Sequence, residues 1–365
     1  MRFPRGWMMV MGFNRTTALL AAAFAISIPV AAQAACDPDA GLTFICGLTN
    51  AEDLVPVPGT PWIVASGIAE GDRNDGHIDL VNAHDRTVRV LLPGHILYRQ
   101  DTATYGGCPG KPDEMQFTAH GLDLRAGAGS AHTLYVVHHG ERESIEVFDL
   151  EAGAAVPALT WVGCVLLPRG ALANGVAALP GNAFAATKFI GTDDPKWMDK
   201  LTAGEPEGGV LLWRPETGWE DLPGAAAISA DNGIAASPDG RAIFVAGTGD
   251  ETVVRLSLDG KPGMRAVIRT GFRTDNLRWG SDGFLYDAGA RDTVPDLMAC
   301  APNTKQRCTG PFSVLRIDPV TLQTREVVHH PGSPNFGAAS TALRIGNEYW
   351  LGTPHGDRIA IAPAD

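Results

Sequence analysis

Residues 118–150 of the chain read TAHGLDLRAGAGSAHTLYVVHHGERESIEVFDL. Apolar side chains recur at every second position in three short runs of this stretch, which is the period of half-buried β-strands. The runs contain Leu122 and Leu124, Leu134 and Val136, and Ile145 and Val147. His120 and His139 stand at the two ends of the first strand–turn–strand unit. Because they are 19 residues apart, they can meet only if the two strands fold back on each other.

The same pattern recurs along the chain: a polar residue, a short apolar strand, a turn rich in Gly, Pro or Asp, and a second apolar strand. Six repeats begin at Glu52, His120, Asn174, Asn232, Asn276 and Ser340. Repeats of roughly four short strands are typical of radial β-sheets around a central channel. We therefore predict an all-β fold, a six-bladed β-propeller with a metal ion in the central channel, built from one domain over residues 35–365.

The first 34 residues have a different character. A basic start precedes an apolar run over residues 16–30 and the small-residue motif Ala32-Gln33-Ala34, which together indicate a cleaved signal peptide over residues 1–34. The apolar run is shorter than the ~20 residues of a membrane span. A lipoprotein anchored at Cys36 is the alternative form. We expect an exported protein, periplasmic or secreted, without stable membrane insertion after cleavage.

Charge and cysteine content limit the partners and the compartment. Removing the three arginines of the signal peptide changes the formal net charge from −12 to −15, which argues against nucleic acid as a partner. The six cysteines all follow residue 35, and an even number in an oxidising compartment favours disulfides. Fifteen pairings are possible. We expect local bonds Cys36–Cys46 and Cys300–Cys308, which leaves Cys108–Cys164; the oligomeric state is not predicted.

The repeat starts predict a metal site, because equivalent residues of the innermost strands face the propeller axis. The candidate ligands are Glu52, Asn174, Asn232, Asp275 and Asn276. Carboxylate and amide oxygens without thiolates favour Ca²⁺ or Mg²⁺ over Zn²⁺, and six or seven oxygens suit Ca²⁺ better. The alternatives are plainer: Asn-Gly pairs are common turns, and Glu52 with Asp53 could belong to a solvated loop.

The two histidines predict a proton acceptor beside this metal. His120 would act as a general base on water, and His139 would orient it or relay the proton. A histidine that is only hydrogen-bonded in the core is the alternative for each. His138 should point to the opposite face of its strand. The chain contains no Gly-x-Ser-x-Gly motif, which argues against a serine nucleophile of the α/β-hydrolase type.

These residues resemble the paraoxonase/arylesterase family of calcium-dependent lactonases and, more distantly, the gluconolactonase and senescence-marker-protein group. The matching segments are Glu52-Asp53-Leu, His120-Gly, Val136-Val-His-His139 with Ser144-Ile-Glu-Val-Phe, Asn174, Asn232-Gly-Ile with Ser237-Pro-Asp-Gly, Asp275-Asn276, and Ser340-Thr-Ala with Leu351-Gly-Thr. The resemblance implies a six-bladed propeller whose catalytic calcium is bound by the five candidate ligands, with His120 and His139 as a histidine dyad.

The resemblance also implies a second, structural calcium bound by Asp53 and the carbonyl of Leu122. A further ligand of that ion would be an Asp where this chain has Gly175. The family's disulfide between the chain termini has no counterpart here, since Cys308 is the last cysteine. Closure of the ring must then rest on strand pairing or on other disulfides.

The expected function is calcium-dependent hydrolysis of small-molecule lactones or aryl esters. One alternative is a non-catalytic, calcium-stabilised propeller that binds a sugar or a peptide, and another is a sugar-lactone hydrolase. Four residues are expected to form an apolar mouth that favours lipophilic lactones: Phe117, Phe189, Trp197 and Met198.

Overall fold

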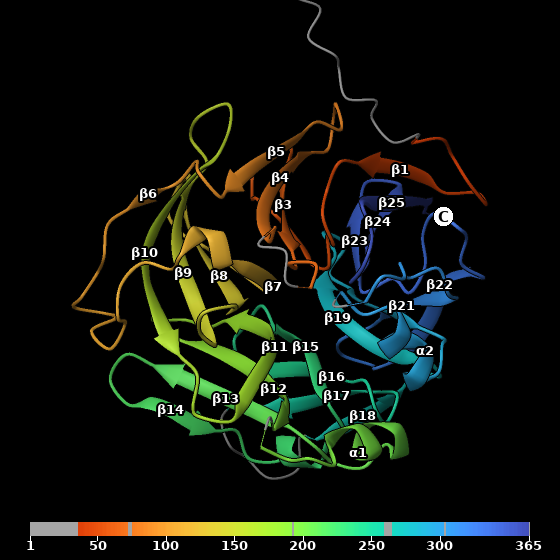
Figure 1. Cartoon of the computed structure of the whole chain (residues 1–365). Coiled ribbons are helices and arrows are strands. Elements are labelled where there is room, and N and C mark those ends of the chain that lie inside the picture. Colours follow the sequence, from red (N-terminus) through yellow and green to blue (C-terminus); the bar gives the residue numbers. More distant parts are fainter. Residues whose placement is uncertain (1–35, 72–74, 192, 259–264, 303, 365) are drawn as a thin grey trace, which may run out of the picture. The chain divides into compact units, whose positions relative to one another are not determined.

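The computed structural model describes residues 36–71, 75–191, 193–258, 265–302 and 304–364. The predicted signal peptide over residues 1–34 lies outside these ranges. Within them the chain forms six sheets, almost entirely antiparallel, arranged as the blades of a propeller, which confirms the predicted all-β, six-bladed fold (Figure 1). None of the helices in the described ranges is long and apolar enough to cross a membrane.

Each blade is a run of strands that are consecutive or nearly consecutive in the sequence. Blade 1 contains β2 (Leu54–Pro56), β3 (Trp62–Gly67), β4 (His77–Asn82) and β5 (Val88–Leu92). Blade 2 contains β7 (Thr118–Ala126), β8 (Ala131–His139), β9 (Ser144–Glu151) and β10 (Ala158–Leu166), with β6 (Leu97–Tyr98) parallel to β10 at its outer edge. Blade 3 contains β11 (Ala171–Ala178), β12 (Phe184–Gly191), β13 (Gly209–Arg214) and β14 (Gly218–Asp221).

The last three blades repeat this plan. Blade 4 contains β15 (Asp231–Ala236), β16 (Ala242–Gly247), β17 (Thr252–Ser257) and β18 (Ala266–Arg269). Blade 5 contains β19 (Arg273–Trp279), β20 (Leu285–Ala290), β21 (Phe312–Ile317) and β22 (Thr324–His330). Blade 6 contains β23 (Thr341–Ile345), β24 (Glu348–Gly352), β25 (Arg358–Pro363) and β1 (Thr43–Cys46).

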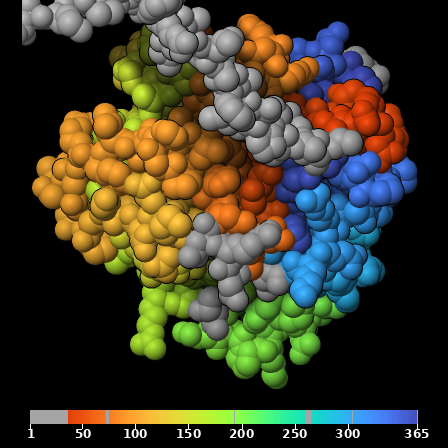
Figure 2. Space-filling view, turned by 45° about the horizontal axis from the view of Figure 1, so that its top comes forward, coloured from red at the N-terminus to blue at the C-terminus, as the bar shows by residue number. Residues whose placement is uncertain are grey.

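The ring is closed by pairing of the two ends of the described chain. Strand β1 pairs antiparallel with β25, so that Thr43 lies opposite Ile361, and Figure 2 shows these red and blue segments side by side. The innermost strands β2, β7, β11, β15, β19 and β23 contact one another in this order, and β23 contacts β2 again. Closure by strand pairing is one of the two possibilities that the sequence left open.

The connections carry the helices and the disulfides. The helices are α1 (Trp197–Ala203), α2 (Val294–Ala299) and the short 3-10 helices η1 (Glu114–Gln116) and η2 (Ala225–Ala227). All three predicted disulfides form: Cys36–Cys46, Cys108–Cys164 and Cys300–Cys308. They are compatible with an exported protein.

Candidate metal and histidine site

Four of the six inner strands lose their regular register at the residues that the sequence singled out. The interruptions lie between Ala119 and Leu122, Ala173 and Val176, Asp231 and Ile234, and Thr274 and Leu277. A bulge of this kind redirects a side chain away from the regular alternation of a strand. Asn174 and Asn232 therefore lie inside β11 and β15, and the alternative interpretation of Asn174-Gly175 and Asn232-Gly233 as turns is wrong.

The glycine after each polar residue allows the next inner strand to approach closely. A Cβ atom on Gly121 would lie 2.3 Å from the carbonyl oxygen of Asn174, and one on Gly233 would lie 2.3 Å from that of Asp275. Gly175 leaves slightly more room, with 2.9 Å to the carbonyl oxygen of Asn232. No side chain fits at these distances, so glycine is required for neighbouring blades to pack around the axis.

Several of the predicted metal ligands offer buried oxygens without a hydrogen-bond partner in the part of the chain that the structure describes. Within the described ranges, four of these ligands have a buried side-chain oxygen without a hydrogen-bond partner: Glu52 Oε2, Asn174 Oδ1, Asn232 Oδ1 and Asp275 Oδ1. The buried carboxylates of Asp79, Asp231 and Asp287 also have oxygens unpartnered by the described residues. The Asn232 amide is oriented by its donation to Thr248 Oγ1 at 3.0 Å, and Asn276 Nδ2 donates to Glu52 Oε1 at 2.5 Å. Buried polar atoms normally have a partner, so the unpartnered oxygens of the four ligands are available to a cation.

Electrostatics point in the same direction. Burial raises the pKa of Glu52 well above its usual range, and the nearby carboxylates of Asp275 and Asp53 raise it further. Burial and the charge of Asp53 raise the pKa of Asp275 to about 8. Buried like charges oppose ionisation, and a bound dication would relieve this cost.

The residues present therefore fit a hard cation. Within the described ranges, no three His, Cys, Asp or Glu side chains are placed to hold a metal ion. An ion at this position would accordingly depend on the amide oxygens as well as on the carboxylates of Glu52 and Asp275. Such a set of oxygen donors suits Ca²⁺.

The two residues expected at a second ion are brought together, but around a different cation. Arg278 donates from Nε to Asp53 Oδ1 at 2.9 Å and from Nη2 to the Leu122 carbonyl at 2.6 Å. Its Nη2 also forms a salt bridge with Asp53 Oδ2. These residues therefore do not fit a second metal ion at this position. Arg278 was not predicted from the sequence, because its burial is visible only in the structure.

The histidines lie beside each other, as the hairpin of β7 and β8 requires. Thr118 pairs with His139 across these strands, and His120 Nδ1 lies 2.9 Å from His139 Nε2. The other nitrogen of His139, Nδ1, lies 2.7 Å from Glu143 Oε2. Glu143 was not predicted from the sequence. It extends the pair into a chain of three polar side chains that ends in a carboxylate.

His120 is held in the neutral state beside the metal ligands. Burial lowers its pKa well below the usual value, and His139 lowers it further. Its Nε2 atom is 3.9 Å from Glu52 Oε2, which is too long for a hydrogen bond. The lone pair of Nε2 is therefore free of that carboxylate.

His138 faces away from the pair. It is fully buried, stacks on Phe117 with 4.6 Å between ring centroids, and lies 3.0 Å from Glu141 Oε2. This agrees with the opposite orientation predicted for adjacent strand residues. It also corrects the expected apolar mouth, because Phe117 is 1% exposed and packs within the core.

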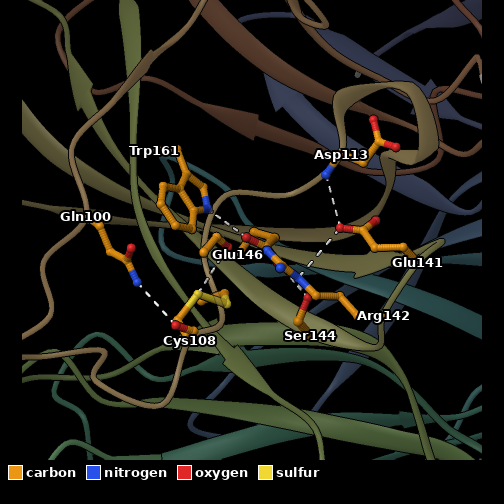
Figure 3. The surroundings of a disulfide bond; sticks show 10 residues. Gln100, Cys108, Asp113, Glu141, Arg142, Ser144, Glu146 and Trp161 are labelled. Carbon is orange, nitrogen blue, oxygen red and sulfur yellow. Dashed lines mark hydrogen bonds and ion pairs between the residues drawn. A yellow bond between two sulfur atoms is a disulfide. The ribbon is translucent and has the colours of Figure 1, made fainter.

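The loop between β8 and β9 is fixed by a buried ion pair beneath it. Glu146 is fully buried and accepts from Arg142 Nε at 2.9 Å, from Ser144 Oγ at 2.7 Å and from Trp161 Nε1 at 2.7 Å. Figure 3 shows the Trp161 ring and the Arg142 side chain both directed at Glu146, close to the Cys108 disulfide. This network holds the short loop that carries Glu143.

Three of the four residues expected at an apolar mouth do pack together. Phe189, Trp197 and Met198 contact a small buried cluster that includes Ala230 and Val294. Ala230 comes two residues before the candidate ligand Asn232. The cluster therefore joins α1 and α2 to the start of β15.

Comparison with known proteins gives a shared fold but no family. No family model matches the chain, and no curated protein matches it. A luciferin-regenerating enzyme has a TM-score of 0.53 at 10% identity, covering 88% of this chain and 95% of that one. A protein of unknown function from Bacteroides thetaiotaomicron has a TM-score of 0.50 at 11% identity, covering 89% and 76%. A provisionally assigned gluconolactonase has a TM-score of 0.48 at 16% identity, covering 89% and 93%.

Proposed function

We propose that the protein is an exported, calcium-dependent hydrolase of lactones or aryl esters, as the resemblance to paraoxonases implies. The observation that carries this proposal is the placement of four unpartnered oxygens next to a neutral histidine. Glu52, Asn174, Asn232 and Asp275 would hold Ca²⁺, together with Asn276. When bound, this cation polarises the substrate carbonyl and stabilises the negative charge that develops on its oxygen.

The chain itself supplies the proton acceptor. His139 Nδ1 faces a carboxylate, so it carries the proton and leaves Nε2 to accept one from His120 Nδ1. The acceptor lone pair of His120 is then on Nε2, on the side of Glu52. This tautomer makes His120 Nε2 the atom that takes a proton from water.

The reaction can be written with its atoms balanced. A water oxygen bonds to the carbonyl carbon while one water proton passes to His120 Nε2. The bond between that carbon and the ester oxygen then breaks, and the departing alkoxide takes the proton back from His120. Glu143 and His139 stabilise the positive charge that His120 carries in between. A lactone gives a hydroxy acid, and an aryl ester gives an acid and a phenol.

The test is a set of lactones and aryl esters assayed with the calcium-loaded protein, before and after EDTA treatment. We expect turnover that EDTA abolishes, calcium restores and Asp275→Asn removes. Asp221→Asn, at an exposed carboxylate on β14, is the matched control and should keep full activity. Undiminished turnover by metal-free protein would refute the proposal.

The same experiment separates the alternatives. A sugar-lactone hydrolase would turn over polar lactones in preference to lipophilic ones. A non-catalytic propeller would bind a sugar or peptide in calorimetry and hydrolyse none of the substrates, while calcium would still raise its melting temperature. The pKa values of Glu52 and Asp275 are raised, so a bound dication would stabilise the fold even without catalysis. A purely stabilising ion is therefore the alternative to test.

A further inference from the structure

The channel contains a second polar centre, in which a side chain already provides the positive charge. Arg278 lies on β19, two residues after Asn276, and is 7% exposed. Its guanidinium contacts the Asp53 carboxylate and the carbonyl oxygens of Leu122 and Leu277. These acceptors come from three different blades, so one arginine side chain links β2, β7 and β19.

Asp53 has all its oxygens satisfied, in contrast to Glu52 and Asp275. Its Oδ1 accepts from the Leu54 amide at 2.9 Å and from Arg278 Nε, and its Oδ2 accepts from the Leu122 amide at 2.8 Å and from Arg278 Nη2. Asp53 is fully buried. Two charge-assisted hydrogen bonds and two amide donors use the lone pairs that a metal ion would need.

We propose that the Arg278 guanidinium is a built-in cation that excludes a metal ion from Asp53 and Leu122, so that the channel takes a divalent cation only at the Glu52–Asp275 end. A guanidinium stays protonated at every pH at which proteins fold, and its planar fork matches a carboxylate. A dication at the same acceptors would face this charge at close range and would leave buried N–H donors without partners. The exclusion of a metal ion from Asp53 is independent of the proposed function. The expectation that the wild type binds one ion, at Glu52 and Asp275, rests on the proposed function.

Arg278 also separates the candidate metal site from a cavity at the other end of the inner strands. This cavity has a volume of about 630 Å³ and is lined by Arg278, Asp123 and Trp279, among others. On β19 the chain passes from Asp275 and Asn276 to Arg278 and then to Trp279. Shortening Arg278 would therefore open a route from this cavity to Asp53, through which a hydrated ion could reach the vacated carboxylate.

The experiment counts bound ions in variants of this one side chain. Ca²⁺ bound per chain is measured by equilibrium dialysis for the wild type, Arg278→Met, Arg278→Lys and the double variant Arg278→Met/Asp53→Asn. Arg278→Met should bind one more ion than the wild type. Arg278→Lys, which keeps the charge, should not gain an ion, and the double variant should lose the gain.

Thermal unfolding provides the second readout. Calcium should raise the melting temperature of Arg278→Met by several degrees more than that of the wild type, and this excess should vanish in the double variant. Equal ion counts in Arg278→Met and the wild type would overturn the proposal. If Arg278→Met does not fold, the wild type decides: two bound ions per chain would also overturn it, and at most one supports it.

The outcome is separate from that of the proposed function. If the wild type bound no Ca²⁺, the proposed calcium site at Glu52 and Asp275 would be contradicted. A gain of one ion in Arg278→Met would still establish that Arg278 excludes a metal ion from Asp53. Conversely, an active, calcium-dependent wild type with no gain in Arg278→Met would leave the hydrolase proposal standing and remove the role of Arg278.

Discussion

Replacing Asp275 by asparagine should make the metal-free protein more stable. In the folded protein burial and the charge of Asp53 raise the pKa of Asp275 to about 8, against about 3.9 in an unfolded chain. The native state therefore holds a proton that the unfolded state releases, and the stability of the wild type falls as the pH rises between these two values. Each pH unit in this window costs about 1.4 kcal/mol.

The magnitude follows from the width of the window. A pH of about 7 lies roughly three pH units above the pKa of the unfolded state. The wild type has therefore lost about 4 kcal/mol of its free energy of unfolding at that pH. Asparagine has nearly the same shape and cannot ionise. In EDTA, Asp275→Asn should therefore exceed the wild type in the free energy of unfolding by about 4 kcal/mol at about pH 7, and the difference should shrink to near zero at about pH 4.

The assay is urea unfolding followed by tryptophan fluorescence, in EDTA, at several pH values across this window. Asp221→Asn controls for the loss of one negative charge and should show no such pH dependence. In calcium the difference should shrink, since only the wild type gains about 2.7 kcal/mol at a concentration of a hundred times the Kd. A pH-independent difference, or a less stable Asp275→Asn in EDTA, would refute the reasoning.

Three further outcomes are expected. Glu143→Gln should lower kcat by about tenfold or more, because His139 loses its charged acceptor, whereas Glu141→Gln on the same loop should keep kcat; equal effects of the two would contradict the relay. Gly121→Ala should cost about 1–3 kcal/mol in urea unfolding, because its Cβ would meet the backbone of the next blade at 2.3 Å; an unchanged midpoint would show that the blades can separate freely. Glu146→Ala should cost about 3–5 kcal/mol, because it removes the buried carboxylate that pairs with the Arg142 guanidinium, and a loss below about 1 kcal/mol would mean that water replaces the carboxylate.

The sequence predicted the ring of strands, and it supplied the candidate ligands, for one physical reason. Comparing the repeats identifies equivalent positions in the sequence, and equivalent positions in a propeller face the same axis. Asn174 and Asn232 were recognisable in this way even though each Asn-Gly pair alone is typical of a turn. The register interruptions that direct these side chains to the axis leave no sequence signature beyond the following glycine.

Two functional side chains, Glu143 and Arg278, could not be predicted from the repeat pattern, because their positions are not repeated in the other blades. Glu143 lies on a turn, where no alternation assigns a face, and its contact with His139 depends on the buried pair of Glu146 and Arg142. Arg278 stands at a strand position where a charged side chain would ordinarily point to solvent. Only the three-dimensional packing places it beside Asp53, on a different blade.

The pairing of β1 with β25 has a consequence for the order of assembly. Thr43 and Ile361 come from opposite ends of the described chain, so the last blade is completed by a segment that is synthesised before all the others. Contacts of such long sequence separation form late and slowly. Since the five candidate ligands come from blades 1, 3, 4 and 5, calcium added during refolding should report ring closure, and its uptake should follow the slowest kinetic phase.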